Sequence, residues 1–314
     1  MTKEDLRIVF MGTPEFAVAS LQALVERGYN VVAVVTQPDK PVGRHAVMTA
    51  PAVKRYAQEK GIPVLQPVKM KDPAFIEALQ QYHADLQVVV AFRMLPEQVW
   101  AMPRFGTFNV HASLLPQYRG AAPINWAIIN GETETGVTTF FLDHMIDTGR
   151  IIMQRHFPIA DDANVEQVYD GLMRLGADVA VETVNLLIAS DGDIESIPQS
   201  EADDLKPAPK IFKETCEIDW HKSCKQVYDF IRGLSPVPGA WANMVLHEGQ
   251  APQVVKFFAA KKTSETAECD PGKLKVDKKR LLVATSDCWL EITELQLAGK
   301  KRMPAADFIN GLKK

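Results

Sequence analysis

The chain reads Ile8-Val9-Phe10-Met11-Gly12-Thr13-Pro14-Glu15 after a short polar start. Its first five residues are an apolar run, as expected of a buried strand. The Thr-Pro-Glu that follows fits a turn and then the first turn of a helix, where Pro and an acidic residue are favoured. The segment predicts the opening of a βα unit.

The same pattern continues through the first half of the chain. Residues 31–36 and 86–92 are near-continuous apolar runs rich in β-branched residues, typical of parallel strands covered on both faces. Residues 164–190 keep apolar side chains at helical spacing, which predicts one long helix. The sequence therefore predicts a doubly wound α/β domain over residues 1–190.

The composition changes after this domain. Residues 191–210 are rich in Asp, Glu, Ser and Pro, which is typical of a linker. Beyond it, an amphipathic helix is expected over residues 224–234. Short strand-like runs at 254–259, 281–284 and 289–295 predict a small β-barrel or sandwich over residues 211–314.

Composition narrows the class of protein. With 314 residues, 46% of them hydrophobic and 24% charged, the chain has the size of two globular domains. No stretch approaches the roughly 20 apolar residues of a membrane span, and we expect a cytoplasmic protein. The four cysteines form no C-x-x-C pair, so free thiols are expected.

The net charge of −4 is unevenly distributed. Residues 211–314 hold 17 Lys and Arg against 13 Asp and Glu, a net charge of +4, whereas residues 1–210 carry −8. The basic clusters at 273–275, 278–280 and 300–302 could contact phosphates. Composition alone is equally compatible with a solvated surface.

Two polar residues stand close together in Thr107-Phe108-Asn109-Val110-His111. If this alternating segment is a strand, Asn109 and His111 point from the same face. Residues 112–120 read as a loop, so the pair would sit at the carboxyl end of a strand, where open α/β sheets bind ligands. The competing interpretation is that both side chains only satisfy loop backbone.

A carboxylate candidate follows at Asp147, in the loop Leu142-Asp143-His144-Met145-Ile146-Asp147-Thr148-Gly149. An Asp before Thr-Gly is commonly a turn residue that bonds its own backbone. Spacing does not decide between Asp143 and Asp147, nor exclude a metal site. The absence of a further His or Cys cluster argues against a metal.

Familiar nucleotide and hydrolase motifs are missing. The chain has no G-x-G-x-x-G, no G-x-x-x-x-G-K-[ST] and no G-x-S-x-G. Dinucleotide binding, nucleoside triphosphate binding and a serine nucleophile elbow therefore have no motif support.

The chain resembles the 10-formyltetrahydrofolate-dependent formyltransferases in the run Asn109-x-His111-x-Ser113-Leu114-Leu115-Pro116-x-x-Arg119-Gly120-x-x-Pro123, with Asp147-x-Gly149 downstream. Residues 10–14, 36–39, the linker and 295–301 are similar to the branch of this family that acts on methionyl-tRNA. The resemblance covers nearly the whole chain. It implies a Rossmann-like first domain and an OB-like β-barrel second domain, a fold that commonly binds nucleic acid.

Residue by residue, the resemblance assigns catalysis to Asn109, His111 and Asp147. The amide N–H of Asn109 and a protonated His111 would stabilise a tetrahedral oxyanion. Asp147 would either tune His111 or move a proton from the attacking amine to the folate. The tetrahydrofolate site would comprise Ser113, Leu114, Leu115 and Pro116, with an apolar pocket from Phe92, Met94 and Leu95, although Met and Phe there could equally be core.

For the acceptor, the loop Asp39-Lys40-Pro41-Val42-Gly43-Arg44 resembles the family's basic loop that approaches the tRNA acceptor end. Arg44 is the first candidate contact, followed by Lys206 and Lys210. The sequence departs from the more basic versions of the loop at His45-Ala46-Val47, and from the usual Gly at Met145.

The implied activity is transfer of formyl from 10-formyltetrahydrofolate, without a metal, to the amino group of initiator methionyl-tRNA in translation initiation. The expected partners are that tRNA and a reduced folate, with no membrane, and a monomer is expected. Formylation of a sugar amine is the nearest rival. A formyl hydrolase is a third enzymatic candidate, and an RNA-binding protein with a decayed active site is a candidate from another class.

Overall fold

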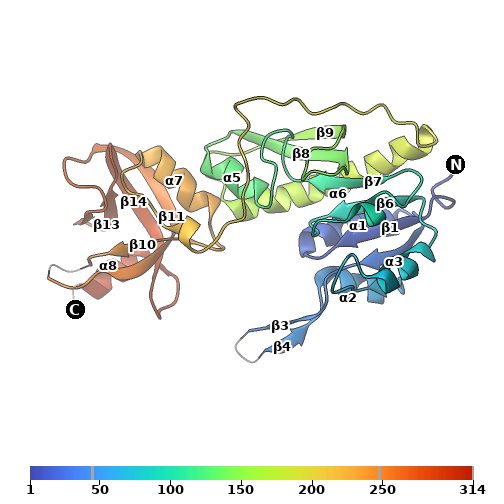
Figure 1. Cartoon of the computed structure of the whole chain (residues 1–314). Coiled ribbons are helices and arrows are strands. Elements are labelled where there is room, and N and C mark those ends of the chain that lie inside the picture. The colour runs from blue at the N-terminus through green and yellow to red at the C-terminus, as the bar shows by residue number, and fades with distance from the viewer. Residues whose placement is uncertain (44–45, 247–248, 313–314) are drawn as a thin grey trace. The chain divides into compact units, whose positions relative to one another are not determined.

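The computed structural model describes residues 1–43, 46–246 and 249–312 (Figure 1). It divides into two compact units. The first comprises residues 1–120, 135–157 and 169–207, and the second comprises residues 121–134, 158–168 and 208–314.

A seven-stranded sheet in the order β5-β2-β1-β6-β7-β8-β9 forms the centre of the first unit. The strands β5, β2, β1, β6 and β7 are parallel, and β8 runs antiparallel to β7. In order along the sheet, the strands are β5 (Val64–Leu65), β2 (Val31–Val35), β1 (Ile8–Gly12), β6 (Leu86–Val90), β7 (Thr107–His111), β8 (Glu134–Phe141) and β9 (Ile151–Pro158). The predicted strands and the parallel sheet are confirmed.

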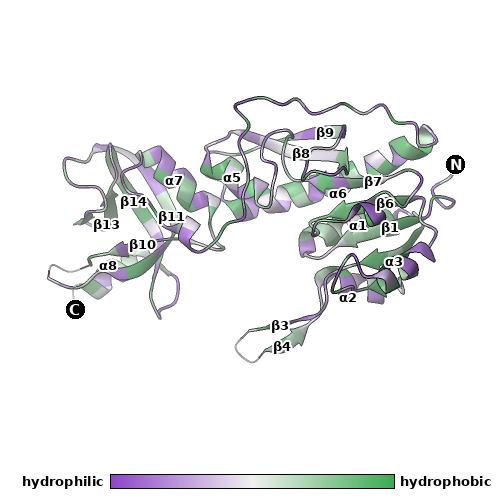
Figure 2. Ribbon diagram, viewed as in Figure 1, coloured by the Kyte–Doolittle hydropathy of each residue, from purple (hydrophilic) through white to green (hydrophobic). Residues whose placement is uncertain are grey.

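Every residue of β1 and β6 is buried, because parallel strands have both faces covered. These strands are hydrophobic in Figure 2. Pro14 is the N-cap of α1 (Glu15–Glu26). Only a glycine fits at Gly12, because a Cβ there would lie 2.6 Å from the Cβ of Ala17.

The remaining helices of this part of the chain are α2 (Ala52–Glu59), α3 (Pro73–Gln80), α4 (Glu97–Trp100) and α6 (Val165–Ala189). The single long helix expected over 164–190 is thus confirmed as α6. The strands β3 (Lys40–Val42) and β4 (Val47–Thr49) pair antiparallel.

The second unit contains an antiparallel sheet in the order β10-β11-β14-β13-β12, with β15 paired to β14. The strand β11 has register shifts against β14, and such irregularities let a long strand bend. The elements are α5 (Pro123–Ile129), η1 (Glu214–Cys216), α7 (Cys224–Gly233), β10 (Ala240–Met244), β11 (Gln253–Thr266), β12 (Leu274–Asp277), β13 (Arg280–Ala284), β14 (Cys288–Leu297), β15 (Met303–Pro304) and α8 (Ala305–Leu312). The expected small β domain is confirmed, and its sheet is antiparallel.

A capping box opens α7. The hydroxyl of Ser223 accepts from the backbone of Gln226, whose side chain accepts from the Ser223 backbone in return. Such reciprocal pairing satisfies two amide donors at the helix start. The apolar face of α7 joins a buried core with Phe257 and Ile292.

Candidate active site

Asn109 is the central residue of β7, and His111 is the residue at its carboxyl end. They alternate with the buried Phe108 and Val110, so the two polar side chains share one face of the sheet. Asn109 is the most exposed residue of β7, and the other four are buried. The strand predicted over residues 107–111, with its two polar residues on one face, is confirmed.

The imidazole of His111 has a defined orientation. Its Nε2 lies 2.9 Å from the carbonyl oxygen of Tyr118, so Nε2 carries a hydrogen and donates. The ring also makes an edge contact with Phe140, which is fully buried. The other ring nitrogen, Nδ1, is therefore the one available for chemistry.

Asp147 provides the carboxylate that faces this nitrogen. Its Oδ2 lies 3.9 Å from Nδ1 of His111, and the two side chains are only 12% and 7% exposed. That distance suits an ion pair but is too long for a direct hydrogen bond. Nδ1 of His111 therefore has no direct hydrogen bond to Asp147 and is open to a substrate atom beside the carboxylate.

The carboxylate of Asp147 is bound by a residue distant in the sequence rather than by the backbone of its own turn. The backbone N–H of Gly120 donates to Oδ2 at 2.9 Å. Asp143 makes the turn contacts instead, because its Oδ1 accepts from Met145 N–H and from the hydroxyl of Thr148. The structure thus gives the two acids different roles, which sequence spacing could not do. Asp143 stabilises the turn, and Asp147 faces His111.

Asn109 retains an unused hydrogen-bonding position. Its Oδ1 is buried and has no hydrogen-bond partner among the described residues. Buried polar atoms are rarely left unpaired in native proteins. The carboxamide beside His111 is therefore suited to a substrate group.

Internal contacts lock the loop that carries Ser113, Leu114, Leu115 and Pro116. The hydroxyl of Ser113 donates to Gln117 O at 2.7 Å, and that of Thr138 donates to Ser113 O at 2.6 Å. Gln154 donates to Leu115 O at 2.8 Å. Ser113 and Leu115 are buried, so they shape the loop, whereas Leu114 and Pro116 are partly exposed.

Thr138 and Gln154 are residues that sequence reasoning missed. Both lie on strands, β8 and β9, and each is an ordinary polar residue with no motif around it. Their role depends on contacts made 25 and 39 residues away.

The predicted folate-pocket residues that follow β6 differ in how exposed they are. Leu95 is buried in the core, and Phe92 packs against the same core. Met94 is 69% exposed and is the one of the three that is freely available to a ligand. Arg93 between them donates to the carbonyls of Pro67 and Val68, and burial lowers the pKa of its guanidinium from the usual value.

Of the predicted tRNA contacts, Arg44 lies outside the described residues. Lys206 and Lys210 are exposed, and the ammonium of Lys210 lies 5.4 Å from the ring centroid of Phe212. Two arginines of the predicted basic clusters are ion-paired, Arg280 with Glu265 and Arg302 with Glu294.

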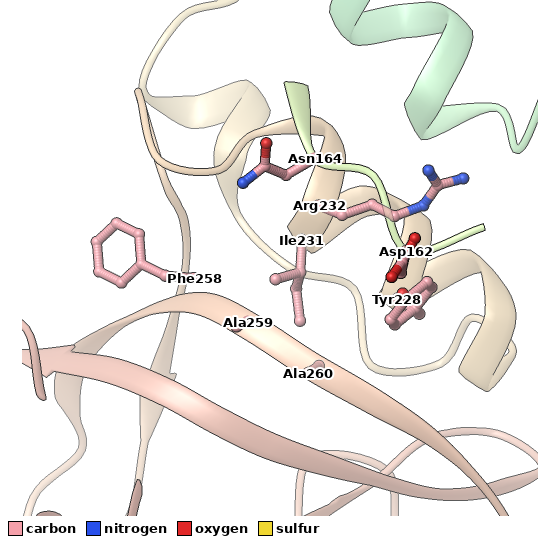
Figure 3. Close-up of a pocket in the computed structure, with 8 residues that line it drawn as sticks. All are labelled: Asp162, Asn164, Tyr228, Ile231, Arg232, Phe258, Ala259 and Ala260. Atoms are coloured by element: carbon pink, nitrogen blue, oxygen red, sulfur yellow. The ribbon is translucent and has the colours of Figure 1, made fainter. Parts of the chain in front are cut away.

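The second unit has a pocket of its own between α7 and β11, and Figure 3 shows its lining. The guanidinium of Arg232 in this lining is bound to Asp229 at 2.8 Å and to the carbonyl of Ala163 at 2.8 Å. Both charged side chains are buried. The ion pair lies within α7, and the hydrogen bond from Arg232 to the carbonyl of Ala163 joins α7 to the segment around residue 163.

Among residues 1–43, 46–246 and 249–312, no three His, Cys, Asp or Glu side chains gather in a way that could hold a metal ion. No helix in those ranges is long and apolar enough to serve as a membrane span.

Two family models match this chain, one after the other along the sequence. A family model described as "Formyl transferase" matches residues 6–184. A second, described as "Formyl transferase, C-terminal domain", matches residues 210–313.

Relatives match over the full length. The methionyl-tRNA formyltransferase of Parabacteroides distasonis is 60% identical over 319 aligned residues, which cover 100% of this chain and 98% of that protein. The protein of the same name from Bacteroides fragilis is 58% identical, with 99% and 96% covered. That from Porphyromonas gingivalis is 48% identical, with 99% and 97% covered.

Solved structures share the fold at lower identity. HypX from Aquifex aeolicus in complex with tetrahydrofolic acid has a TM-score of 0.64 at 21% identity, covering 98% of this chain and 48% of that one. WlaRD, a sugar 3N-formyl transferase, has a TM-score of 0.64 at 19% identity, covering 94% and 99%. Given the family models and full-length relatives, the chain belongs to the formyl transferase family.

Proposed function

We propose that this chain transfers a formyl group from 10-formyltetrahydrofolate to the amino group of the methionyl moiety on initiator methionyl-tRNA, in translation initiation. The observation that carries the chemistry is the pairing of His111 with Asp147, with Asn109 on the same face of β7 as His111. The choice of methionyl-tRNA as the acceptor is supported by the full-length relatives named methionyl-tRNA formyltransferase.

The reaction begins when the amine nitrogen attacks the formyl carbon. A carbon–nitrogen bond forms, and the carbonyl electrons move to the oxygen. A hydrogen on Nδ1 of His111, the ring nitrogen 3.9 Å from Oδ2 of Asp147, is the donor we assign to this oxyanion. Because Nε2 also donates, the imidazole that does so is the cationic form. The nearby carboxylate stabilises the charged imidazole that such a donor requires.

Asn109 serves the same step. Its amide N–H is a second donor for the oxyanion, and its unpaired Oδ1 can accept a hydrogen from the attacking amine. A preformed donor of this kind contributes about 3 kcal/mol to transition-state stabilisation.

The tetrahedral species then collapses. The bond between the formyl carbon and the folate nitrogen breaks, and that nitrogen takes up the proton that the amine loses. Asp147 is suited to relay this proton, because its Oδ2 is held by Gly120 while the carboxylate remains next to Nδ1 of His111. The folate would rest against the loop of Leu114 and Pro116 and the exposed Met94.

The acceptor side is assigned by residue type and position. We propose that residues 1–190 form the catalytic domain, 191–210 a linker and 211–314 a tRNA-binding domain. Arg44 would approach the acceptor end, and the exposed Lys206 and Lys210 would contact phosphates. The enzyme would act as a monomer in the cytoplasm.

Formyl transfer from labelled 10-formyltetrahydrofolate tests this proposal. Met-charged initiator tRNA, Met-charged elongator tRNA and an amino-sugar nucleotide are offered in parallel. Selective labelling of the initiator supports the proposal. Labelling of the sugar alone would keep the catalytic site but overturn the tRNA acceptor, and no labelling at all would refute the transferase assignment.

A further inference from the structure

The stretch between α6 and the second unit is tied to the first unit. Ile197 and Ile151 exchange two backbone hydrogen bonds, each 2.8 Å long. Ser196 accepts from Nε of Arg150 at 2.9 Å. Residues 196–206 are here called the clamp segment. Its first two residues therefore have fixed neighbours despite the linker-like composition of the segment.

Gln199 uses both ends of its carboxamide in this segment. Its Nε2 donates to the carbonyls of Asp147 at 2.9 Å and Gly149 at 2.8 Å. Its Oε1 accepts from Nε and Nη2 of Arg119 at 3.0 and 2.8 Å. Gln199 thus joins the 147–149 loop to the residue that precedes Gly120.

Both loops joined by Gln199 set the position of one carboxylate. Asp147 belongs to one loop, and Gly120, which donates to its Oδ2 at 2.9 Å, belongs to the other. Asp147 has a φ of +56°, a conformation that is strained for a residue with a side chain. Strained backbone persists where surrounding contacts hold it, and Gln199 supplies two of these contacts.

The clamp segment also contacts the residues that support His111, the partner of Asp147. The N–H of Lys206 donates to Oε1 of Gln117 at 2.8 Å, and the carbonyl of Lys206 accepts from Tyr118 N–H at 2.7 Å. Tyr118 is the residue whose carbonyl receives Nε2 of His111. One segment therefore braces the supports of both His111 and Asp147.

We propose that Gln199 is a positioning residue for formyl transfer, which fixes the carboxylate of Asp147 opposite Nδ1 of His111. Gln199 acts through the two loops and does not touch the reacting atoms. This inference rests on the proposed function, because its effect is measured on formyl transfer.

The test compares Gln199→Ala with Ser196→Ala in the full-length enzyme. Both variants remove a side-chain hydrogen bond of the clamp segment, but only Gln199 is linked to Asp147. Displacement of a catalytic group by about 1 Å can cost on the order of 100-fold in rate. We expect Gln199→Ala to lower kcat about 10- to 100-fold, with little change in KM for either substrate, and Ser196→Ala to keep the wild-type kcat.

The variant Gln199→Glu separates the two ends of the carboxamide. It keeps an acceptor for Arg119 but loses the donors to the carbonyls of Asp147 and Gly149. A loss of kcat as large as that of Gln199→Ala supports the proposal. Wild-type kcat in Gln199→Ala, or a loss confined to KM for tRNA, would overturn it, since the latter would make Gln199 a tRNA contact.

If Gln199→Ala does not fold, a second variant tests the same role. Gln117→Ala removes the acceptor for Lys206 N–H and is expected to lower kcat while thermal melting remains cooperative. Wild-type kcat in Gln117→Ala would then overturn the role of the clamp segment. Failure of the proposed function looks different, because the wild-type enzyme itself would not formylate methionyl-tRNA.

Discussion

The substitution Asp147→Asn separates two tasks of this side chain. The carboxylate lies 3.9 Å from Nδ1 of His111 and also accepts the N–H of Gly120 at 2.9 Å. Asparagine keeps an oxygen for Gly120 but removes the charge. We therefore expect the loop to remain in place while the interaction with a protonated His111 is lost.

The distance and burial set the size of the effect. Opposite unit charges about 4 Å apart attract by about 4 kcal/mol at the effective dielectric constant of about 20 that suits protein sites. Solvent screens this pair little, because the side chains are 7% and 12% exposed. Loss of the whole interaction from the transition state corresponds to a decrease in kcat of about 1,000-fold.

The folded state should respond much less. Because Asn retains the acceptor for Gly120, the free energy of unfolding should change by less than about 1 kcal/mol. Asp147→Ala also leaves the Gly120 N–H unpaired, which costs about 1–3 kcal/mol. Urea unfolding of the two variants therefore distinguishes charge from loop support.

Single-turnover formylation with both substrates saturating measures the rate. A large loss of rate in Asp147→Asn with wild-type stability supports the charge interaction with His111. Wild-type turnover in Asp147→Asn, combined with a loss in Asp147→Ala, would show that the residue only holds the loop. That result would refute the electrostatic reasoning.

Three further results are expected. Asn109→Ala should lower kcat about 100- to 1,000-fold through loss of an oxyanion donor, and near-normal single-turnover rates would contradict this assignment. Gly149→Ala should destabilise the protein by about 3 kcal/mol in urea unfolding, because a Cβ would lie 1.6 Å from Phe141 O; wild-type stability would show that the loop can yield. Burial raises the pKa of the Cys288 thiol to about 12, so iodoacetamide at pH 8 should modify the partly exposed Cys269 before Cys288. Mass spectrometry of the labelled protein measures the order, and equal labelling of the two thiols would refute the raised pKa.

The local pattern of the sequence determined most of the secondary structure. Apolar runs predicted β1, β2 and β6, and helical periodicity predicted α6 over nearly its full length. Such patterns succeed because burial on one or two faces imposes a repeat along the chain itself. The alternation in β7 likewise predicted that Asn109 and His111 share a face.

The partners of the polar residues followed from the tertiary structure alone. Sequence spacing left Asp143 and Asp147 equivalent. Contacts of Asp147 with Gly120, 27 residues away, and with His111 separate them. Gln199 lay in a segment that composition marked as a linker, yet it binds two loops of the site. A single hydrogen bond between distant residues leaves no period in the sequence. The chain pattern and the family resemblance therefore supplied the candidate reacting groups, whereas the contacts that hold these groups in place were decided by the tertiary structure.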